Sequence, residues 1–458
     1  MDFVADLHLH SKYSRAVSQD MVLPQMAKWA RIKGVDVLSA TDFTHPLWLR
    51  ELKSLLKEEY EGLYSLKSEA GKTGPDRTTL FLLSTEISSI YKQEDKLRRI
   101  HNLVFAPNIE TVEKINKEFL RRGFNLSSDG RPIIGLSSVG LLELLLSIDT
   151  RILLIPCHVW TPHFGMYGSA SGFDSIEESF GEYGKYIYGV ETGLSSDPEM
   201  NWQMAELKTR SILSFSDAHS NPKMGREATV FALRKNEISN LKSQITNLSY
   251  DDFTQAIKRT PDSKLKIAYT IEFYPEEGKY HFSGHRNCKI VKGPDETRKD
   301  GNMCPVCKKR LTEGVLYRVQ QLSSEKLIGN VDVKLSPSGI KWYTDKTRTH
   351  PPFVKLVPLL EIIAEALKST TSSQKVRNAY TDLCKEFKSE IEILLKVPIE
   401  TIEKTGGQKI AEGVDKVRRG DIVIDPGYDG EYGKVKIWND HSVTEATNEA
   451  IAQIGIDF

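Results

Sequence analysis

The first ten residues of the chain bring together three side chains that bind metal ions. Asp6, His8 and His10 stand at alternate positions of the segment DLHLH. In a β-strand alternate side chains point to the same face, so the three would share one face. Two imidazoles aimed at one point repel each other when protonated, unless they hold a metal ion. The segment therefore predicts a metal site at the end of a first strand; the alternative is an exposed edge strand with chance histidines.

Length, composition and charge limit the classes of protein to which the chain could belong. The chain has 458 residues, of which 39% are hydrophobic and 27% charged, which is ordinary for a globular protein of about two or three domains. We find no apolar run that could cross a bilayer and no signal peptide before the first motif, so we expect no membrane contact and a cytoplasmic location. Lys+Arg and Asp+Glu both total 62. This balance gives no support to wholesale nucleic-acid binding but leaves room for a local basic groove.

Short apolar segments alternate with helical ones in the first half of the chain. Helices are expected at 23–34, 109–123 and 137–149, the first with Pro24 in its first turn and Gly34 at its end. Repeated βα units imply a parallel sheet, most economically a barrel. The expected strands are 2–10, 35–42, 79–88, 100–107, 131–137, 151–159, 186–193 and 211–219.

Histidines and carboxylates recur at the ends of these strands, where a βα-barrel carries its active face. Imidazole and carboxylate suit Zn²⁺, Mn²⁺ or Fe²⁺. The set is too large for one ion, so it predicts two or three ions with a bridging carboxylate, an arrangement suited to phosphoester hydrolysis by metal-activated water. Glu86, Asp217 and His219 are the candidate catalytic residues. The candidate ligands are His8, His10, Asp42, His45, Glu86, His101, His158, Asp217 and His219. Asp42 and also Glu191 could be either ligands or supporting partners of the ligands.

A second metal pattern follows the barrel. His285, Cys288, Cys304 and Cys307 have the x₂ and x₁₅ spacings of a closed structural zinc site. His281 is the alternative fourth ligand. The two other cysteines, Cys157 and Cys384, lie in apolar segments and are expected in the core.

Several segments resemble a known superfamily. DLHLHS, TDFTHP, STE, IHNLVF, PCHVW and SDAHS, in this order, resemble the polymerase and histidinol phosphatase (PHP) superfamily. The segments ATDFTHPLW, ETGLSSDPEMNW, SDAHSNPKMGREATVF and PGYDGEYG, together with the zinc pattern, resemble the endonuclease Q family over roughly the whole chain. The resemblance implies an α/β fold: a distorted seven-stranded βα-barrel with a trinuclear metal centre at 1–262, a small zinc module at 263–325, and a mainly helical DNA-binding region with a flexible tail at 326–458.

The resemblance also distributes the ligands. One ion would take His8, His10, Glu86 and Asp217; a second would share Glu86 with His101 and His158; a third would use His219. Members of the superfamily often have a histidine directly after Asp42, where this chain has Phe43, and His45 is the candidate substitute. The expected cofactors are two or three divalent ions in the barrel (Zn²⁺, Mn²⁺ or Mg²⁺) and one structural Zn²⁺.

The function implied by the resemblance is DNA repair. The enzyme would hydrolyse the phosphodiester 5′ to uracil, hypoxanthine, xanthine or an abasic site, leaving 3′-hydroxyl and 5′-phosphate ends, with damaged DNA as its partner. Two alternatives stay open: a small-molecule phosphatase on the same barrel, and a non-catalytic DNA-binding protein with a decayed metal site.

Two segments offer contacts to DNA. The long loop after His158 carries aromatic residues that could stack on a base and small residues that would let a nucleic-acid backbone approach. A packed surface loop could have the same composition and is the alternative. Lys223 and Arg226 could bind phosphate. In the segment KVRRG, Lys416, Arg418 and Arg419 are either a backbone grip or a solvated helix face. The candidate residues of the loop are Trp160, Phe164, Tyr167, Ser169, Ser171 and Gly172.

The last six residues, QIGIDF, resemble the peptide by which bacterial repair proteins bind the sliding clamp. Gln453, Ile456 and Phe458 would supply one amide and two apolar side chains to a preformed pocket. The sliding clamp is therefore a candidate partner, and a tail packed on the protein's own surface is the alternative.

Overall fold

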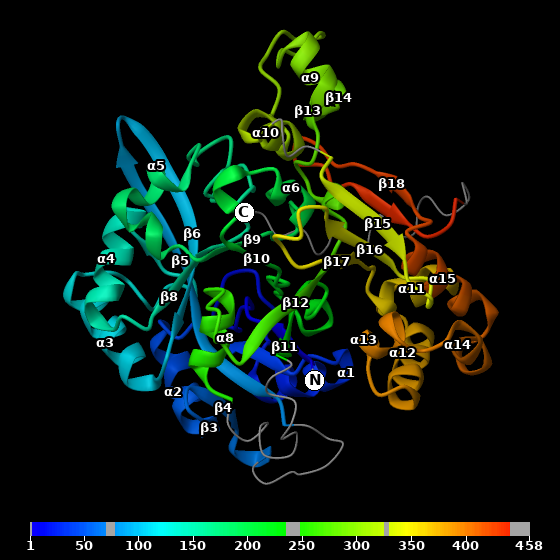
Figure 1. The fold of residues 1–458 in the computed structure, drawn as a ribbon, viewed down its shortest axis with the longest axis horizontal. Helices are drawn as coiled ribbons and strands as arrows, with labels where there is room; N and C mark the ends of the chain where they lie inside the picture. Colours follow the sequence, from blue (N-terminus) through cyan, green and yellow to red (C-terminus); the bar gives the residue numbers. More distant parts are fainter. Residues whose placement is uncertain (1, 70–77, 235–247, 325–328, 440–458) are drawn as a thin grey trace.

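The fold was analysed in a computed structural model, which describes residues 2–69, 78–234, 248–324 and 329–439 (Figure 1). The candidate clamp-binding residues Gln453, Ile456 and Phe458 lie outside the described residues. None of the helices in the described ranges is long and apolar enough to span a bilayer.

Seven strands form a closed ring at the centre of the molecule, which confirms the predicted barrel. Hydrogen-bonded pairs run from β1 through β2, β5 and β6 to β8, and β9 pairs with β10. Val159 N donates to Glu191 O at 3.2 Å and joins β8 to β9. A bridge between Leu9 and Ala218 joins the end of β10 back to β1. The strands are β1 (Asp2–Asp6), β2 (Val37–Ala40), β5 (Leu80–Gln93), β6 (Lys96–Ala106), β8 (Leu153–Pro156), β9 (Gly189–Glu191) and β10 (Ser211–Leu213).

The distortion of the barrel lies in β6. The sequence predicts a parallel sheet throughout, but β6 runs antiparallel to both β5 and β8. Only Glu94 and Asp95 separate β5 from β6, and both have left-handed backbone angles (φ 50° and 62°). Such a two-residue turn matches the twist of a hairpin and leaves no room for a crossover helix.

The helices at 23–34, 109–123 and 137–149 are confirmed, and local signals explain their ends. Gly34 closes the first with φ 87°. Asn108 and Ser137 cap the other two by accepting hydrogen bonds from Thr111 N and Gly140 N. The helices of this half are α1 (Leu23–Lys33), α2 (Pro46–Leu55), α3 (Ile109–Arg121), α4 (Ser138–Ile148), α5 (Ile176–Phe180), α6 (Pro198–Trp202) and α8 (Tyr250–Ile257).

The sheet continues beyond the barrel on both sides. β11 pairs antiparallel with β1, β12 pairs with β11, and β17 and β16 carry the sheet on to β15. The sheet thus crosses the predicted boundary at 262/263 and includes strands from the predicted C-terminal region; the three-domain division itself stays a prediction. The additional strands are β3 (Leu56–Tyr60), β4 (Leu63–Leu66), β7 (Ile133–Ile134), β11 (Ala228–Leu233), β12 (Leu265–Glu272), β15 (Val331–Leu335), β16 (Lys341–Asp345) and β17 (Phe353–Lys355).

Two smaller units flank this sheet (Figure 1). The one at the top of the view carries the predicted zinc ligands and consists of β13 (Ser283–His285), β14 (Ile290–Lys292), α9 (Pro294–Asp300) and α10 (Val315–Leu322). The one at the right is mainly helical, as predicted. It contains α11 (Leu359–Ala366), α12 (Gln374–Glu386), α13 (Glu390–Leu395), α14 (Ile399–Gly406), α15 (Gln408–Arg419) and the hairpin of β18 (Val423–Asp425) and β19 (Lys434–Lys436).

Of the three basic residues at the end of α15, Arg418 serves the fold, while Lys416 and Arg419 form pairs with Asp421 and Asp415 near the surface. The Arg418 guanidinium is buried and donates to the carbonyls of Ile393, Leu394 and Val397 at the end of α13. An arginine so placed satisfies orphan carbonyls of a helix end. The expected DNA grip by this side chain is therefore not what the structure shows.

A buried ion pair ties the barrel to the helical unit. Lys33 Nζ, at the end of α1, lies 2.8 Å from Glu390 Oε2, at the start of α13. Glu390 also accepts hydrogen bonds from Tyr380 Oη at 2.6 Å and from Leu359 N at 3.1 Å. Both charges are almost fully buried, so each depends on the other for compensation.

Removal of Glu390 should destabilise the protein strongly. Glu390→Ala leaves the Lys33 ammonium buried without its counter-charge, and we expect a loss of about 3–5 kcal/mol in the free energy of unfolding. The exposed pair Lys396–Glu392 is the matched control, and Glu392→Ala should cost less than about 1 kcal/mol. Thermal and urea unfolding followed by circular dichroism measure both. Equal losses of unfolding free energy in the two variants would contradict a stabilising role for the buried Lys33–Glu390 pair.

Candidate metal centre

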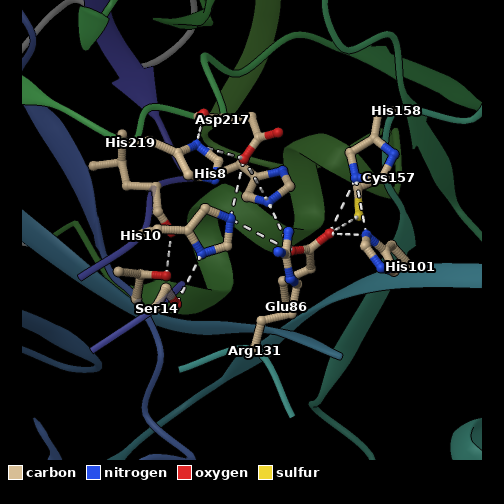
Figure 2. Close-up of polar contacts among 12 residues, drawn as sticks. His8, His10, Ser14, Glu86, His101, Arg131, Cys157, His158, Asp217 and His219 are labelled. Atoms are coloured by element: carbon tan, nitrogen blue, oxygen red, sulfur yellow. Dashed lines mark hydrogen bonds and ion pairs between the residues drawn. The ribbon is translucent and has the colours of Figure 1, made fainter. Parts of the chain in front are cut away.

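The carboxylate of Glu86, on β5, lies between two groups of histidines at the mouth of the barrel (Figure 2). Its Oε1 is 2.6 Å from His101 Nδ1 and 3.0 Å from His158 Nε2. Its Oε2 is 3.3 Å from His10 Nε2 and 3.9 Å from His8 Nε2. One carboxylate thus faces both groups, which is the position of a bridging ligand between two ions.

Asp217 completes the group on the His8 and His10 side. Its Oδ1 lies 3.0 Å from His10 Nε2 and 3.6 Å from His8 Nε2. The candidate ligand atoms of these three residues lie within 4.8 Å of one another, and so do those of Glu86, His101 and His158. The structure therefore gathers two sets of three side chains of the kind that hold a divalent cation.

Two buried carboxylates hold the histidines of β1 from behind. Glu191 Oε1 lies 2.9 Å from His8 Nδ1, and Asp42 Oδ1 lies 3.3 Å from His10 Nδ1. Asp42 is itself held by Ser11 and by Ser14, whose Oγ donates at 2.8 Å. A carboxylate on one ring nitrogen fixes the tautomer and turns the other nitrogen toward an ion. Asp42, predicted as a ligand, thus lies behind His10 and orients it.

The inward-facing atoms of this group converge on one another and on the Glu86 carboxylate. His8 Nε2, His10 Nε2 and Asp217 Oδ1 are buried and form no hydrogen bond of normal geometry with any described residue. Buried polar atoms normally find a partner, and three that converge without one are costly. A bound cation would satisfy all three at once, so the residues present fit a divalent metal.

The ionisation of His101 and His219 suits the same purpose. On the other side, burial alone would lower the pKa of His8 and of His10, but the carboxylates around them outweigh it and raise that pKa well above its usual range. Burial lowers the pKa of His101 and of His219 to about 4, which leaves both imidazoles neutral at pH 7. Burial alone would raise the pKa of Glu86, but His101 and Arg131 outweigh it and hold that pKa well below its usual range. Neutral imidazoles and ionised carboxylates are the forms that bind metal ions.

Strained backbone shapes the site. Asp42, His158 and Asp217 all have left-handed angles, with φ of 53°, 34° and 46°. Non-glycine residues adopt these angles at a cost of about 1–3 kcal/mol each, and they collect at functional sites. Gly130 is required beside them, because a Cβ there would lie 2.4 Å from Asp42 Oδ2 and 2.3 Å from Ser14 Oγ.

The third predicted ion has fewer residues around it. The His219 ring lies 4.8 Å from that of His10, and its Nδ1 contacts the carbonyl oxygen of Asp217 at 2.9 Å. His45 does not join it: its ring stacks on Tyr13 at 4.4 Å, and Nε2 lies 3.3 Å from Ser127 O. Phe43 is fully buried in the core. His8, His10, Glu86, His101, His158, Asp217 and His219 are thus together, while His45 and Asp42 stand apart from the ligand atoms.

Two residues of the site were not predicted. Arg131 Nη1 lies 3.2 Å from Glu86 Oε2, and Cys157 Sγ lies 3.6 Å from Glu86 Oε1. Cys157 is fully buried as expected, but it faces the metal centre. Because Cys157 directly precedes His158 at a strand end, its position near the metal centre could have been predicted. The sequence around Arg131 has no comparable feature.

The aromatic loop after His158 is mostly packed inward. Trp160 and Tyr167 are fully buried, and their polar atoms donate to Asn201 Oδ1 at 2.9 Å and to Glu206 Oε1 at 2.8 Å. Neither ring is accessible in this structure. Phe164, in contrast, is half-buried, and its ring lies 4.4 Å from that of His101. It is the aromatic side chain of this loop that borders the metal centre.

The remaining candidate contacts are tied to the protein itself. Ser171 Oγ donates to Arg99 O at 3.4 Å, and Gly172 O accepts a hydrogen bond from Arg98, while Ser169 is half-buried. Lys223 Nζ pairs with Glu361 Oε1 at 2.7 Å. The Arg226 guanidinium donates to Ser216 O at 3.0 and 3.2 Å and braces the strand end before Asp217.

The second metal pattern also converges. His285, Cys288, Cys304 and Cys307 bring one ligand atom each within 4.8 Å of the others, and Cys307 Sγ lies 3.3 Å from His285 Nδ1. His281 is not part of this group, so His285 is the fourth member, as we expected. The geometry suits a closed four-coordinate site.

The two sites should lose their ions independently. Cys304→Ser should remove about one ion per chain and lower the stability of the module, because structural zinc contributes about 10 kcal/mol or more to folding in small modules. Glu86→Gln should remove ions from the barrel and leave the module loaded. Elemental analysis of both purified variants measures this. Loss of the same ions in both, or of none, would contradict the two-site assignment.

Comparisons with known proteins agree with this geometry. A family model described as "MJ0043 C-terminal domain" matches residues 358–421. The chain is 27% identical over 448 residues to "Uncharacterized protein YqxK" of Bacillus subtilis, which covers 94% of this chain and 98% of that protein. It is 30% identical over 278 residues to "Uncharacterized protein MJ0043" of Methanocaldococcus jannaschii. That match covers 60% of this chain, which spans about a third (31%) of the archaeal protein.

Two solved structures match along the chain. The lesion-specific endonuclease PfuEndoQ from Pyrococcus furiosus superposes with a TM-score of 0.76 and 27% identity, over 100% of both chains. The complex of endonuclease Q with a 27-mer duplex substrate carrying an abasic lesion at the active site gives the same TM-score and identity, over 97% of this chain and 98% of that one. By fold and sequence along its length, the chain is similar to endonuclease Q.

Proposed function

We propose that the protein is a metal-dependent DNA repair endonuclease that nicks damaged DNA. The cut would fall 5′ to an abasic site or to a deaminated base such as uracil, hypoxanthine or xanthine. The observation that carries this proposal is the pair of histidine–carboxylate groups joined by Glu86, in a chain that superposes along its length on a lesion-specific endonuclease.

The chemistry follows from the ligand set. When bound, two or three ions such as Zn²⁺, Mn²⁺ or Mg²⁺ would supply an activated water molecule and neutralise the charge of the phosphate. The role of the chain is to keep His101 and His219 neutral and Glu86 and Asp217 ionised. Glu191 and Asp42 orient His8 and His10. No side chain needs to be modified covalently.

The metal module offers a surface for the DNA backbone. Between His285 and Arg310 the sequence has eight Lys and Arg residues against three acidic ones, although the whole chain is neutral. Lys308, Lys309 and Arg310 follow the turn of Cys304–Cys307 and are exposed. Val306, within that turn, is 65% exposed. A basic surface with an apolar tip is typical of modules that bind DNA through its phosphates and grooves.

Phe164 is placed where it could contact a lesion that is flipped out of the duplex. Its half-buried ring borders His101, and a base or an empty sugar turned out of the duplex could rest beside it. Damaged and abasic positions cost less to open than paired bases, which contributes to selectivity.

Asp217→Asn should abolish nicking. The variant keeps the shape of the side chain but removes the charge that faces His8 and His10, so we expect a loss of about 100-fold or more. Glu182→Gln, an equally conservative change on the exposed surface, is the control and should cut like the wild type. The assay is nicking of a labelled duplex with one deoxyuridine or one abasic site, with thermal unfolding to verify the fold.

The same assay separates the alternatives. A small-molecule phosphatase would release phosphate from a monoester and leave both duplexes intact. A non-catalytic DNA-binding protein would bind the lesion duplex without cutting it. Full nicking by Asp217→Asn would contradict the proposed role of the metal centre.

DNA binding should depend on salt, and the metal module should contribute to that dependence. Lys308→Gln combined with Lys309→Gln should lower the slope of log K against log salt by about 2, since each phosphate contact contributes about 0.9. Lys114→Gln with Lys117→Gln, exposed residues on α3 far from the module in Figure 1, is the control. Fluorescence anisotropy at several salt concentrations measures the slope. Equal slopes in both double variants would exclude the module surface.

A further inference from the structure

The hairpin of β5 and β6 continues past the metal centre as an arm (Figure 1). Glu86 and Ser88 are two residues apart on β5 and share a face, and Ser88 lies opposite His101 on β6. Cross-strand partners point to the same side of a sheet. The face that carries the metal ligands therefore extends along the arm beyond them.

One edge of this face exposes an apolar residue. Ile133, on β7, lies beside Ser88 and so faces the same side as His101. Its side chain is 63% exposed, although Ser88 and His101 are buried. Ser88 Oγ, between them, forms no hydrogen bond with any described residue. Ile133 thus places an accessible apolar side chain on the same face as His101, where a bound strand could cover it.

The other edge carries an aromatic ring and a cation. Phe164 bridges to Ile100 at the edge of β6, and its φ of 70° is a strained, left-handed angle. Arg99, two residues before His101 and therefore on the same face, holds its guanidinium 5.9 Å from the centre of the Phe164 ring. Arg99 is half-buried and forms no ion pair with a carboxylate of the described residues.

A second cation lies on the metal side. Arg131 Nη1 is 3.2 Å from Glu86 Oε2, and its side chain is 14% exposed. Its segment is pinned on both sides: Gly130 N donates to Tyr13 O at 3.1 Å, and Ser88 N donates to Pro132 O at 3.0 Å. The guanidinium is therefore held beside the bridging carboxylate by the backbone and not by a flexible loop.

We propose that Arg99, Arg131, Ile133 and Phe164 form a flanking platform that holds the DNA strand on either side of the cut. Arg131 would bind the phosphate that is cut, and Arg99 a neighbouring phosphate. Ile133 and Phe164 would contact the sugars or bases between them. Guanidinium groups match the fork of phosphate oxygens, and apolar or aromatic side chains between them are typical of surfaces that hold an unpaired strand.

The platform rests on the proposed function and refines it, because it names residues that contact the DNA strand and do not bind the ions. If Arg99 and Arg131 served only the fold or the charge of Glu86, their removal would change stability or metal content and not the contact with one particular phosphate. This difference defines the experiment.

The test measures DNA affinity phosphate by phosphate. Binding of a duplex with one abasic site is followed by anisotropy in the Asp217→Asn background, which we expect not to cut. Arg99→Gln and Arg131→Gln should each weaken binding about 10-fold or more, as for a lost charged hydrogen bond, while Arg121→Gln, an exposed arginine on α3, should bind unchanged. Single uncharged methylphosphonates are then placed at successive positions around the lesion.

For each arginine, the platform predicts one methylphosphonate position at which that side chain no longer contributes to binding. The parent protein should lose about as much affinity from this methylphosphonate as it loses from the Gln substitution on the unmodified duplex. The Gln variant itself should lose less than about twofold from the same methylphosphonate. Metal content and thermal midpoint of Arg99→Gln should match the parent, whereas Arg131→Gln also removes a cation beside Glu86 and is compared with the parent at equal metal content. Ile133→Ser should weaken binding with no change in salt slope. Additive losses at every position, or binding equal to Arg121→Gln, would overturn the platform. A wild type that binds the duplex but never nicks it would refute the proposed function alone; one that fails to bind it would refute both.

Discussion

The site depends on one buried carboxylate with two faces. Glu86 sits at the mouth of the barrel with Oε1 toward His101 and His158 and Oε2 toward His8 and His10. A buried charge is costly unless cations or polar groups compensate it. The two histidine groups and Arg131 supply that compensation, and the same arrangement would allow Glu86 to bridge two ions. The surrounding carboxylates act on the histidines rather than on the centre, so they aim the ligands without competing for the ions.

The fold links this centre to the surfaces around it. β5 carries Glu86 inside the barrel and then continues as the arm, where it pairs with β6, which carries Arg99 and His101, and with β7, which carries Ile133. The metal module is anchored to the rim by α10, where the Arg318 guanidinium donates to Tyr167 O at 3.1 Å and to Phe173 O at 3.2 Å. The loop that carries Phe164 is therefore packed between the module and the barrel. A duplex bound to the module would lie near the loop that borders the metals.

Sequence patterns predicted much of this, and physical reasons explain the rest. His8 and His10 on one strand face, the four ligands of the module and the barrel itself follow from periodicity and spacing, which are local. The antiparallel β6 was missed because a Glu-Asp turn is not a usual hairpin signal. For Asp42 the sequence left open a ligand or a supporting partner, and the structure places it behind His10. His45 was the candidate substitute for the histidine missing at Phe43, but tertiary contacts place its ring against Tyr13. Trp160 and Tyr167 were candidates for stacking on a base, with a packed loop as the alternative, and the structure shows both side chains buried.

The central claim is that Glu86 joins two ion sites next to the phosphate that is cut. Anomalous diffraction from a crystal of the protein with a duplex containing one abasic site, recorded on both sides of the zinc and manganese edges, tests it most directly. The account predicts one peak among Glu86, His101 and His158, a second among Glu86, His8, His10 and Asp217, and a third within the cysteine module, with the phosphate 5′ to the lesion beside the first two. Peaks in the module alone, or a lesion phosphate bound elsewhere while the barrel holds ions, would contradict it.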